Sequence, residues 1–165
     1  MSALARWFLS HNSQVSGSDI SSSSTTAELK KQGAKIRIGH RSSNLRSGTD
    51  LVIHTSALPK NNPEIKKAKK LGIPIKTYAE ALGDLTKKYK TIAIAGAHGK
   101  STSTALLSLI LIRAGFDPTV IIGTKLREFS GKNFHKGKSE YLIIEADEHN
   151  AAFLNYHPCA LLITN

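Results

Sequence analysis

The chain has 165 residues and a formal net charge of +11, and 40% of its residues are hydrophobic and 6% aromatic. This length can bury a core in one or two domains, and apolar runs recur along the whole sequence, which excludes a disordered protein. No uninterrupted apolar run reaches the roughly 18 residues of a membrane span, and the short apolar start lacks the features of a secretory signal. We therefore expect a cytoplasmic protein that is not embedded in a membrane.

The first half of the sequence alternates between helix and strand patterns. We predict helices at residues 2–10, 27–32, 63–71 and 78–87, and strands at residues 14–16, 34–38, 50–54 and 73–75. Strand, helix and strand at this spacing are typical of a parallel sheet with crossover helices, which predicts a Rossmann-like α/β domain. Such a domain normally opens with a strand and a glycine turn, whereas this sequence opens with a helix. We therefore expect that the first strand is missing.

A lysine-rich segment at residues 87–90 is the best candidate for a domain boundary. After it come predicted strands at residues 91–95, 119–122, 141–146 and 161–164, and a helix at residues 101–114. The sequence thus predicts a Rossmann-like domain at residues 1–88 and the first part of an ATP-binding domain at residues 89–165.

The positive charge admits several interpretations. Lysines cluster at residues 66–70, 87–90 and 132–138. A nucleic-acid surface would combine such charge with interleaved aromatic residues for base stacking, and the cluster at residues 66–70 has none. We favour a solvated helix face, with general attraction for anionic substrates as the alternative, and we expect no nucleic-acid partner.

Cys159 is the only cysteine, which excludes an intrachain disulfide. It precedes an apolar run, and we interpret it as a small buried side chain at the start of a strand rather than as a reactive thiol.

The strongest motif is a glycine loop between a predicted buried strand and a helix. It reads Gly96-Ala97-His98-Gly99-Lys100-Ser101-Thr102. Loop N–H groups and the helix dipole favour a phosphate group, Lys100 would contact the β- and γ-phosphates, and Ser101 would bind Mg²⁺. The general phosphate loop has a further glycine where this chain has Ile94, so the motif is the shorter G-x-x-G-K-S. A glycine turn with an incidental lysine is the alternative.

An acidic segment follows a second apolar strand about 45 residues later. It contains Glu145, Asp147 and Glu148. Carboxylates at the carboxyl end of a strand in the sheet of a phosphate loop are suited to Mg²⁺, and three acids so close together would repel one another without a cation. A solvated acidic loop is the alternative.

These motifs resemble the Mur ligase family of peptidoglycan synthesis. The loop from Gly96 to Ser101 is similar to the histidine-containing form in the branch that adds L-alanine to UDP-N-acetylmuramate and in its tripeptide-recycling relative. The resemblance also covers residues 15–19, 33–40, 54–64 and 145–154, in the family's own order. It extends over nearly the whole chain.

The resemblance implies an ATP-dependent ligase that activates the muramoyl carboxylate as an acyl phosphate before an amino acid or peptide attacks it. The implied catalytic residues are Lys100 and Glu145, and the implied metal ligands are Ser101 and Glu145. The implied ATP-binding residues are Gly96, Ala97, His98, Gly99, Lys100, Ser101 and Thr102. The implied UDP-sugar residues are Gly17, Ser18, Asp19, Thr55, Ser56 and Ala57. His98 would lie beside the phosphates or would only shape the turn.

Several departures from the family pattern keep alternatives open. The family's opening glycine turn, a further metal-binding histidine and the C-terminal domain are absent, so we expect an N-terminal fragment. His149-Asn150 replaces the usual Ser-Asp of the alanine-adding branch, which keeps the recycling ligase open. A nucleotide- or UDP-sugar-binding fragment without catalysis is a further alternative, whereas folylpolyglutamate synthase lacks a counterpart of residues 11–64. The sequence does not predict an oligomeric state.

Overall fold

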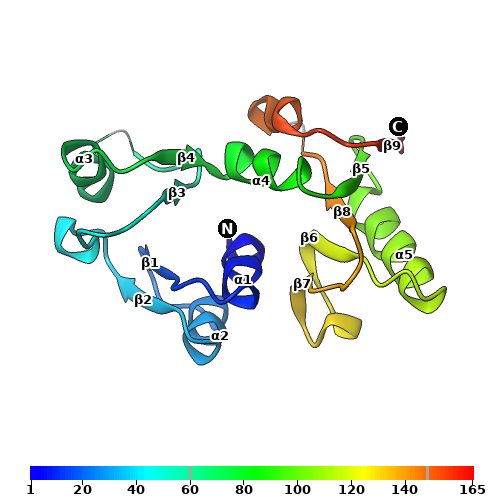
Figure 1. Cartoon of the computed structure of the whole chain (residues 1–165), viewed down its shortest axis with the longest axis horizontal. Coiled ribbons are helices and arrows are strands. Elements are labelled where there is room, and N and C mark those ends of the chain that lie inside the picture. The colour runs from blue at the N-terminus through cyan, green and yellow to red at the C-terminus, as the bar shows by residue number, and fades with distance from the viewer. Residues whose placement is uncertain (60, 148) are drawn as a thin grey trace. The chain divides into compact units, whose positions relative to one another are not determined.

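The computed structural model describes residues 1–59, 61–147 and 149–165, which form two compact units, Met1–Tyr78 and Ala79–Asn165 (Figure 1). Each unit is described by itself. Within the described ranges, no helix is long and apolar enough to cross a membrane.

The first unit contains short helices and strands in alternation. They are α1 (Ser2–Ser10), β1 (Ser16–Asp19), α2 (Ser24–Lys31), β2 (Lys35–Ile38), the 3₁₀ helix η1 (Ser42–Asn44), β3 (Val52–His54), α3 (Pro63–Lys70) and β4 (Ile75–Thr77). β1 pairs with β2 and β3 pairs with β4, both in parallel, as two separate sheets. The predicted parallel strands with crossover helices are therefore confirmed.

Side-chain caps fix where the helices of this unit begin. The Ser23 hydroxyl accepts a hydrogen bond from Thr26 N–H, and the Thr26 hydroxyl oxygen accepts one from Ser23 N–H, which makes a reciprocal capping box for α2. Asn62 Oδ1 accepts hydrogen bonds from the first two available N–H groups of α3, after Pro63. Ser23 and Asn62 thus define where the preceding loops end and α2 and α3 begin.

The second unit is a five-stranded sheet with helices. Its elements are α4 (Tyr78–Thr86), β5 (Lys90–Ala95), α5 (Lys100–Arg113), β6 (Thr119–Leu126), η2 (Arg127–Phe129), β7 (Lys132–His135), β8 (Tyr141–Glu145), η3 (His149–Asn155) and β9 (Ala160–Ile163). The strand order is β7-β6-β8-β5-β9, and all neighbours are parallel except β6 and β7.

The core of this unit lies between the sheet and α5. Its buried members are Ile94, Val120, Ile122, Phe129 and Ile143, and the apolar side chains of α5 pack against them. β5 and β8 are central strands, and this explains why their apolar runs are nearly continuous.

Helix α4 makes its described contacts within the second unit. His157 N–H donates to Thr86 Oγ1 at 3.0 Å, and Thr91 Oγ1 donates to the Thr86 carbonyl at 3.0 Å. Gly83 lies so close to the Asn155 carbonyl that a Cβ would collide with it. The division between the units consequently falls after Tyr78, ten residues before the boundary at residue 88 that the lysine-rich segment suggests.

Two strands begin at other residues than predicted, one because of its pairing with a neighbouring strand and the other because of a preceding proline. β1 covers Ser16–Asp19 instead of residues 14–16, since Ser16 is the first residue in register with β2. β4 begins at Ile75, directly after Pro74, which has no N–H to donate to a ladder. β7 was not predicted at all.

The prediction that Cys159 is buried is wrong, because its side chain is exposed. It directly precedes β9, which is the edge strand of the sheet and is exposed along its whole length. Its backbone N–H still bonds to the Thr91 carbonyl at 2.9 Å, so the residue is held at the sheet edge.

Candidate functional site

The glycine loop joins the end of β5 to the start of α5. Gly96 has φ 131° and Gly99, which caps α5, has φ 79°, and both values favour glycine. The helix begins at Lys100, so its first N–H groups and the positive end of its dipole face this loop. This is the local geometry that suits an anion.

Gly96 lies against the residues that follow β9. A Cβ on Gly96 would collide with Thr164 Oγ1 and lie 3.1 Å from Asn165 N. Thr164 N–H donates to the Ala95 carbonyl at 3.0 Å, which continues the pairing of β5 with β9 into the loop. The absence of a side chain at residue 96 is therefore a packing requirement.

Two residues that the sequence analysis did not select hold the centre of this loop. The Thr164 hydroxyl donates to the His98 carbonyl, and Asn165 Oδ1 accepts a hydrogen bond from His98 N–H at 2.9 Å. A pattern in the sequence could have indicated them, because Thr164 and Asn165 are a polar pair directly after an apolar strand. Such a pair lies at the carboxyl edge of the sheet, where the loop after the neighbouring strand also lies. The backbone of His98 is thus fixed, while Ala97, His98 and Gly99 remain exposed.

Lys100 bends back over the loop that precedes it. Its Nζ donates to the Gly96 carbonyl at 2.6 Å, so the ammonium group lies at the turn itself. Ser101 and Thr102 occupy the first turn of α5, where Ser101 is half-buried and Thr102 exposed. The cation and two hydroxyl groups therefore accompany the helix N-terminus.

Glu145 lies on the strand next to the loop. It ends β8 and is in register with Ile94 of β5, and Ala146 N–H donates to the Ile94 carbonyl at 2.8 Å. Its Oε1 is buried and accepts no hydrogen bond from the described residues. A Cβ on Gly123 of β6 would lie 2.7 Å from Oε2, so the absence of a side chain there leaves room for the carboxylate.

The other carboxylates of the acidic segment do not form a described cluster with Glu145. Asp147 is exposed, and Glu148 lies outside the described residues. Within residues 1–59, 61–147 and 149–165, no group of three or more His, Cys, Asp or Glu side chains could hold a metal ion. Glu145 is thus the described carboxylate closest in the ladder to the loop.

The carboxyl-terminal part of β1, where the sequence suggested a turn at Gly17-Ser18-Asp19, contacts the residues that follow β2. Asp19 carbonyl accepts a hydrogen bond from Gly39 N–H at 2.7 Å, and Ser18 Oγ lies 2.8 Å from His40 Nδ1. Gly17 and Asp19 are exposed and Ser18 is half-buried. His40 is a third residue, after Thr164 and Asn165, that was not predicted as a site residue.

The loop after β3 has its own turn. Leu58 N–H donates to the Thr55 carbonyl at 3.2 Å, and Ala57 N–H donates to Thr55 Oγ1 at 3.4 Å. Thr55, Ser56 and Ala57 are exposed. The structure therefore places both predicted UDP-sugar segments at carboxyl ends of parallel strands of the first unit, and the predicted ATP segment in the second unit.

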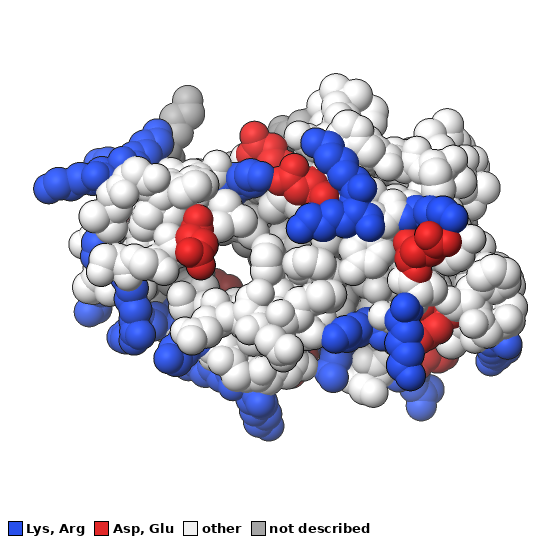
Figure 2. All heavy atoms as spheres, viewed as in Figure 1, with Lys and Arg blue, Asp and Glu red and all other residues white. Residues whose placement is uncertain are grey.

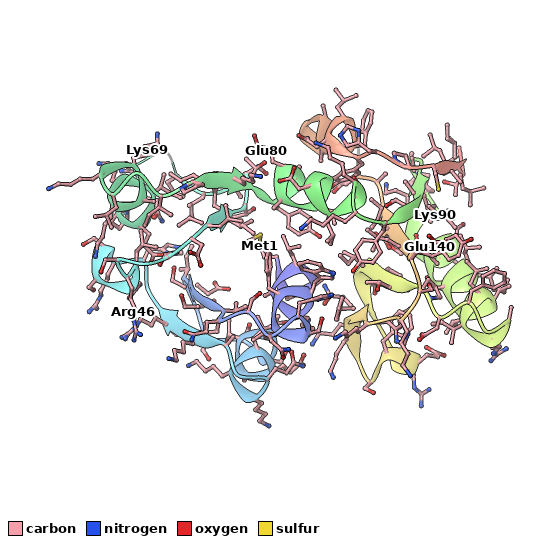
Figure 3. All side chains as sticks on the ribbon, viewed as in Figure 1. Met1, Arg46, Lys69, Glu80, Lys90 and Glu140 are labelled. Atoms are coloured by element: carbon pink, nitrogen blue, oxygen red, sulfur yellow. The ribbon has the colours of Figure 1, made fainter. Side chains whose placement is uncertain are left out.

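Charged side chains elsewhere form separate local pairs. Figure 2 shows Lys and Arg side chains at several places on one face, some beside acidic ones. Lys90 Nζ lies 2.8 Å from Glu140 Oε1 (Figure 3), a hydrogen bond that raises the pKa of Lys90. His135 Nε2 lies 3.0 Å from Asp117 Oδ1, and this hydrogen bond lowers the pKa of Asp117.

Comparisons with known sequences agree on one family. The family model for "Mur ligase family, catalytic domain" matches residues 1–90. The chain is 48% identical over 151 residues to the UDP-N-acetylmuramate–L-alanine ligase of Psychrobacter sp. (strain PRwf-1), which is 92% of this chain and 31% of that protein. It is 45% identical over 165 residues to the ligase of the same name from Aquifex aeolicus (strain VF5), with 100% and 36% covered.

Solved structures share the fold. The UDP-N-acetylmuramate-alanine ligase MurC of Thermotoga maritima superposes with a TM-score of 0.93 at 34% identity and covers 100% of this chain and 38% of its own. A murein peptide ligase from Psychrobacter arcticus 273-4 gives a TM-score of 0.90 at 25% identity, with 100% and 40% covered. The chain thus spans about a third of the length of the curated relatives that it matches.

Proposed function

Because this chain belongs to the Mur ligase family, we propose that it supplies the UDP-sugar and phosphate-binding parts of a ligase that joins L-alanine to UDP-N-acetylmuramate. The observation that carries the proposal is the glycine loop with Lys100 at the start of α5, beside Glu145 on the neighbouring strand. The identity to proteins named as that ligase supports the substrates.

In the proposed reaction, a carboxylate oxygen of the muramoyl group attacks the γ-phosphorus of ATP, and ADP leaves. The amine of L-alanine then attacks the acyl phosphate carbon, loses a proton and displaces inorganic phosphate. The second step forms the amide bond, and ATP supplies the leaving group that a carboxylate lacks. We place this reaction in the cytoplasm, where ATP is available.

The loop residues Gly96, Ala97, His98, Gly99, Lys100, Ser101 and Thr102 would hold the phosphates of ATP. Backbone N–H groups at a helix N-terminus stabilise the oxygens without any reorganisation during the reaction. Lys100 already lies at the turn and would exchange its bond to the Gly96 carbonyl for one to a phosphate oxygen. His98 would contribute mainly its backbone, which Thr164 and Asn165 hold in place.

The residues around Glu145 fit a magnesium ion. A buried carboxylate oxygen without a hydrogen-bond donor is unfavourable alone and becomes favourable beside a cation. Glu145 and the Ser101 hydroxyl would hold the ion together with phosphate oxygens, since oxygen ligands are what Mg²⁺ prefers. When bound, the ion would neutralise charge that develops on the transferring phosphoryl group.

The first unit would hold the UDP-sugar. Gly17, Ser18 and Asp19 lie in β1 up to its carboxyl end, and Thr55, Ser56 and Ala57 directly follow β3. Parallel α/β sheets bind nucleotides at the carboxyl ends of their strands. Hydroxyl groups such as those of Ser18, Thr55 and Ser56 can donate hydrogen bonds to the oxygens of a diphosphate and a sugar.

A tripeptide is the alternative amine. The similarity in fold to a murein peptide ligase, and the His149-Asn150 pair directly after the acidic segment, favour keeping this second candidate. The amine would then be the α-amino group of a peptide, and the chemistry of both steps would be unchanged.

Binding measurements on the chain as it stands test the proposal. We expect calorimetry to show one site for MgATP and one for UDP-N-acetylmuramate, and K100M to weaken binding only at the first. An assay with ATP, UDP-N-acetylmuramate and either L-alanine or the tripeptide then tests turnover. Binding of the UDP-sugar without any release of ADP would contradict catalysis by this chain, and failure to bind either nucleotide would overturn the proposal.

A further inference from the structure

We infer that His40 is a positioning residue for the ligand at the carboxyl end of β1: it donates its Nδ1–H to Ser18 Oγ and so leaves the Ser18 hydroxyl hydrogen available to a ligand oxygen. This inference rests on the proposed function, because the ligand is the UDP-sugar assigned above. It gives specific roles to His40 and Glu64, which lie in stretches that the resemblance covers but are not among the predicted site residues.

The inference starts from three side chains that meet from three segments. Ser18 belongs to β1, His40 follows β2, and Glu64 lies in the first turn of α3. Ser18 Oγ lies 2.8 Å from His40 Nδ1, and the same Nδ1 lies 3.8 Å from Glu64 Oε1. The His40 and Glu64 side chains are only 21% and 18% exposed, so solvent screens their interaction incompletely.

Glu64 is held in place by several other groups. Its Oε1 accepts hydrogen bonds from Asn44 Nδ2 at 2.8 Å and from Arg41 N–H at 3.2 Å. Asn44 Nδ2 also donates to the Gly39 carbonyl at 2.9 Å, which ties η1 to the end of β2. A carboxylate in the first turn of a helix is also favoured by the helix dipole. The negative charge beside His40 is therefore fixed in direction.

This fixed charge selects the donor form of Nδ1. If Nδ1 carried no hydrogen, its lone pair would face the Glu64 carboxylate at 3.8 Å, which is repulsive. With a hydrogen on Nδ1, the ring is attracted to the carboxylate and donates to Ser18 Oγ. The serine oxygen then acts as the acceptor, and its own hydrogen points to another acceptor. A diphosphate or sugar oxygen at the carboxyl end of β1 supplies one.

The same geometry excludes a serine-hydrolase arrangement. In that arrangement the serine and the acid contact different ring nitrogens, so that the imidazole can accept the serine proton. Here Ser18 and Glu64 both face Nδ1, and the acid therefore opposes proton removal from Ser18. The trio orients a hydrogen bond and does not create a nucleophile.

Two kinds of measurement test the inference. In ligand-free protein, side-chain ¹⁵N spectra of His40, assigned by their loss in H40N, should show a hydrogen on Nδ1. For UDP-N-acetylmuramate we expect H40L to weaken binding about tenfold, the effect of a hydrogen bond to a charged ligand. H40N places an amide donor near the Nδ1 position and should stay within about threefold of the unaltered chain. A backbone spectrum of each variant verifies that it is folded.

A double-mutant cycle separates positioning from general damage. S18A should weaken binding as much as H40L, and the S18A/H40L double variant should lose no more than either single variant, because S18A removes the hydroxyl donor and H40L removes the group that orients it. Additive losses, or an Nδ1 without hydrogen, would overturn the inference while the proposed function stands. Binding that H40L leaves unchanged would do the same. An unaltered chain that fails to bind the UDP-sugar would overturn both.

Discussion

The ammonium group of Lys100 donates a 2.6 Å hydrogen bond to the carbonyl oxygen of Gly96, so the lysine closes the loop that it follows. The free loop thus has its cation already placed over the turn. A phosphate group must displace this bond, and it offers a charged acceptor in exchange for a neutral one.

The first prediction concerns this lysine. K100M should weaken MgATP binding by about ten- to a hundredfold, since a hydrogen bond to a charged group contributes about 1.5–3 kcal/mol. Titration calorimetry measures it, with K35M in the first unit as a control that removes the same charge from an exposed strand position. Equal losses in both variants would mean that net charge, and not the loop lysine, governs the affinity.

The second prediction compares two glycines with positive φ. G115A places a Cβ in open space at φ 85° and should cost only the backbone strain of about 1–2 kcal/mol. G96A adds a collision with Thr164 at φ 131° and should cost clearly more in urea unfolding, and it should also weaken MgATP binding. If the two substitutions cost the same free energy, the contact between the loop and the end of β9 is unimportant.

The third prediction is that the substitution E145Q changes stability and magnesium-dependent ATP binding in opposite directions. E145Q replaces a buried carboxylate oxygen that has no described hydrogen-bond partner with a neutral amide. The free energy of unfolding without metal should therefore rise by about 1 kcal/mol, while the magnesium dependence of ATP binding should diminish. D147N alters an exposed carboxylate and should change neither quantity to the same extent. A loss of stability in E145Q would show that the carboxylate has a structural role.

The fourth prediction concerns pH and Asp117. The hydrogen bond from His135 lowers the pKa of Asp117 below its ordinary value of 3.8. The folded state therefore binds fewer protons than the unfolded state near and below pH 3.8, and stability falls as the pH falls through the lowered pKa. Above pH 3.8 the full contribution is present.

D117N tests this contribution with little disturbance, because asparagine tolerates the φ of 44° at this position. Its unfolding free energy should depend less steeply on pH between about 2 and 5 than that of the unaltered chain. H135Q offers an amide nitrogen near the position of Nε2 and should keep more of the effect than H135A. Identical pH profiles for the unaltered chain and D117N would refute the assignment.

Local signals predict most of the fold. The capping pattern of Ser23 and Thr26 and the Asn62-Pro63 pair mark helix starts, and the apolar runs of β5 and β8 mark central strands. β7 escapes prediction because Lys132–His135 is short and polar, and it is a strand only because it pairs with β6. The exposure of Cys159 could not be predicted, because it depends on the strand order, which makes β9 an edge strand and cannot be inferred from the local sequence.

The candidate site is predictable where a single segment carries it. The loop from Gly96 to Ser101 has its glycines, lysine and helix start in consecutive residues, although its role remains a prediction. Thr164 and Asn165 contact the loop from about 66 residues away in the sequence, and His40, which follows β2, contacts Ser18 of β1. Such partners depend on strand pairing, so spacing along the chain cannot identify them.

Cys159 offers a labelling position at the edge of the sheet, because its side chain is exposed although its thiol also donates to the Thr91 carbonyl at 3.3 Å. Because it is the only cysteine of the chain and its backbone is bonded to Thr91 of β5, a fluorophore or spin label attached there reports on a defined position without any mutagenesis. β9 ends at the glycine loop, so a label at its beginning lies one short strand away from the proposed phosphate site. A natural attachment point is thus available for following nucleotide binding in the unaltered protein.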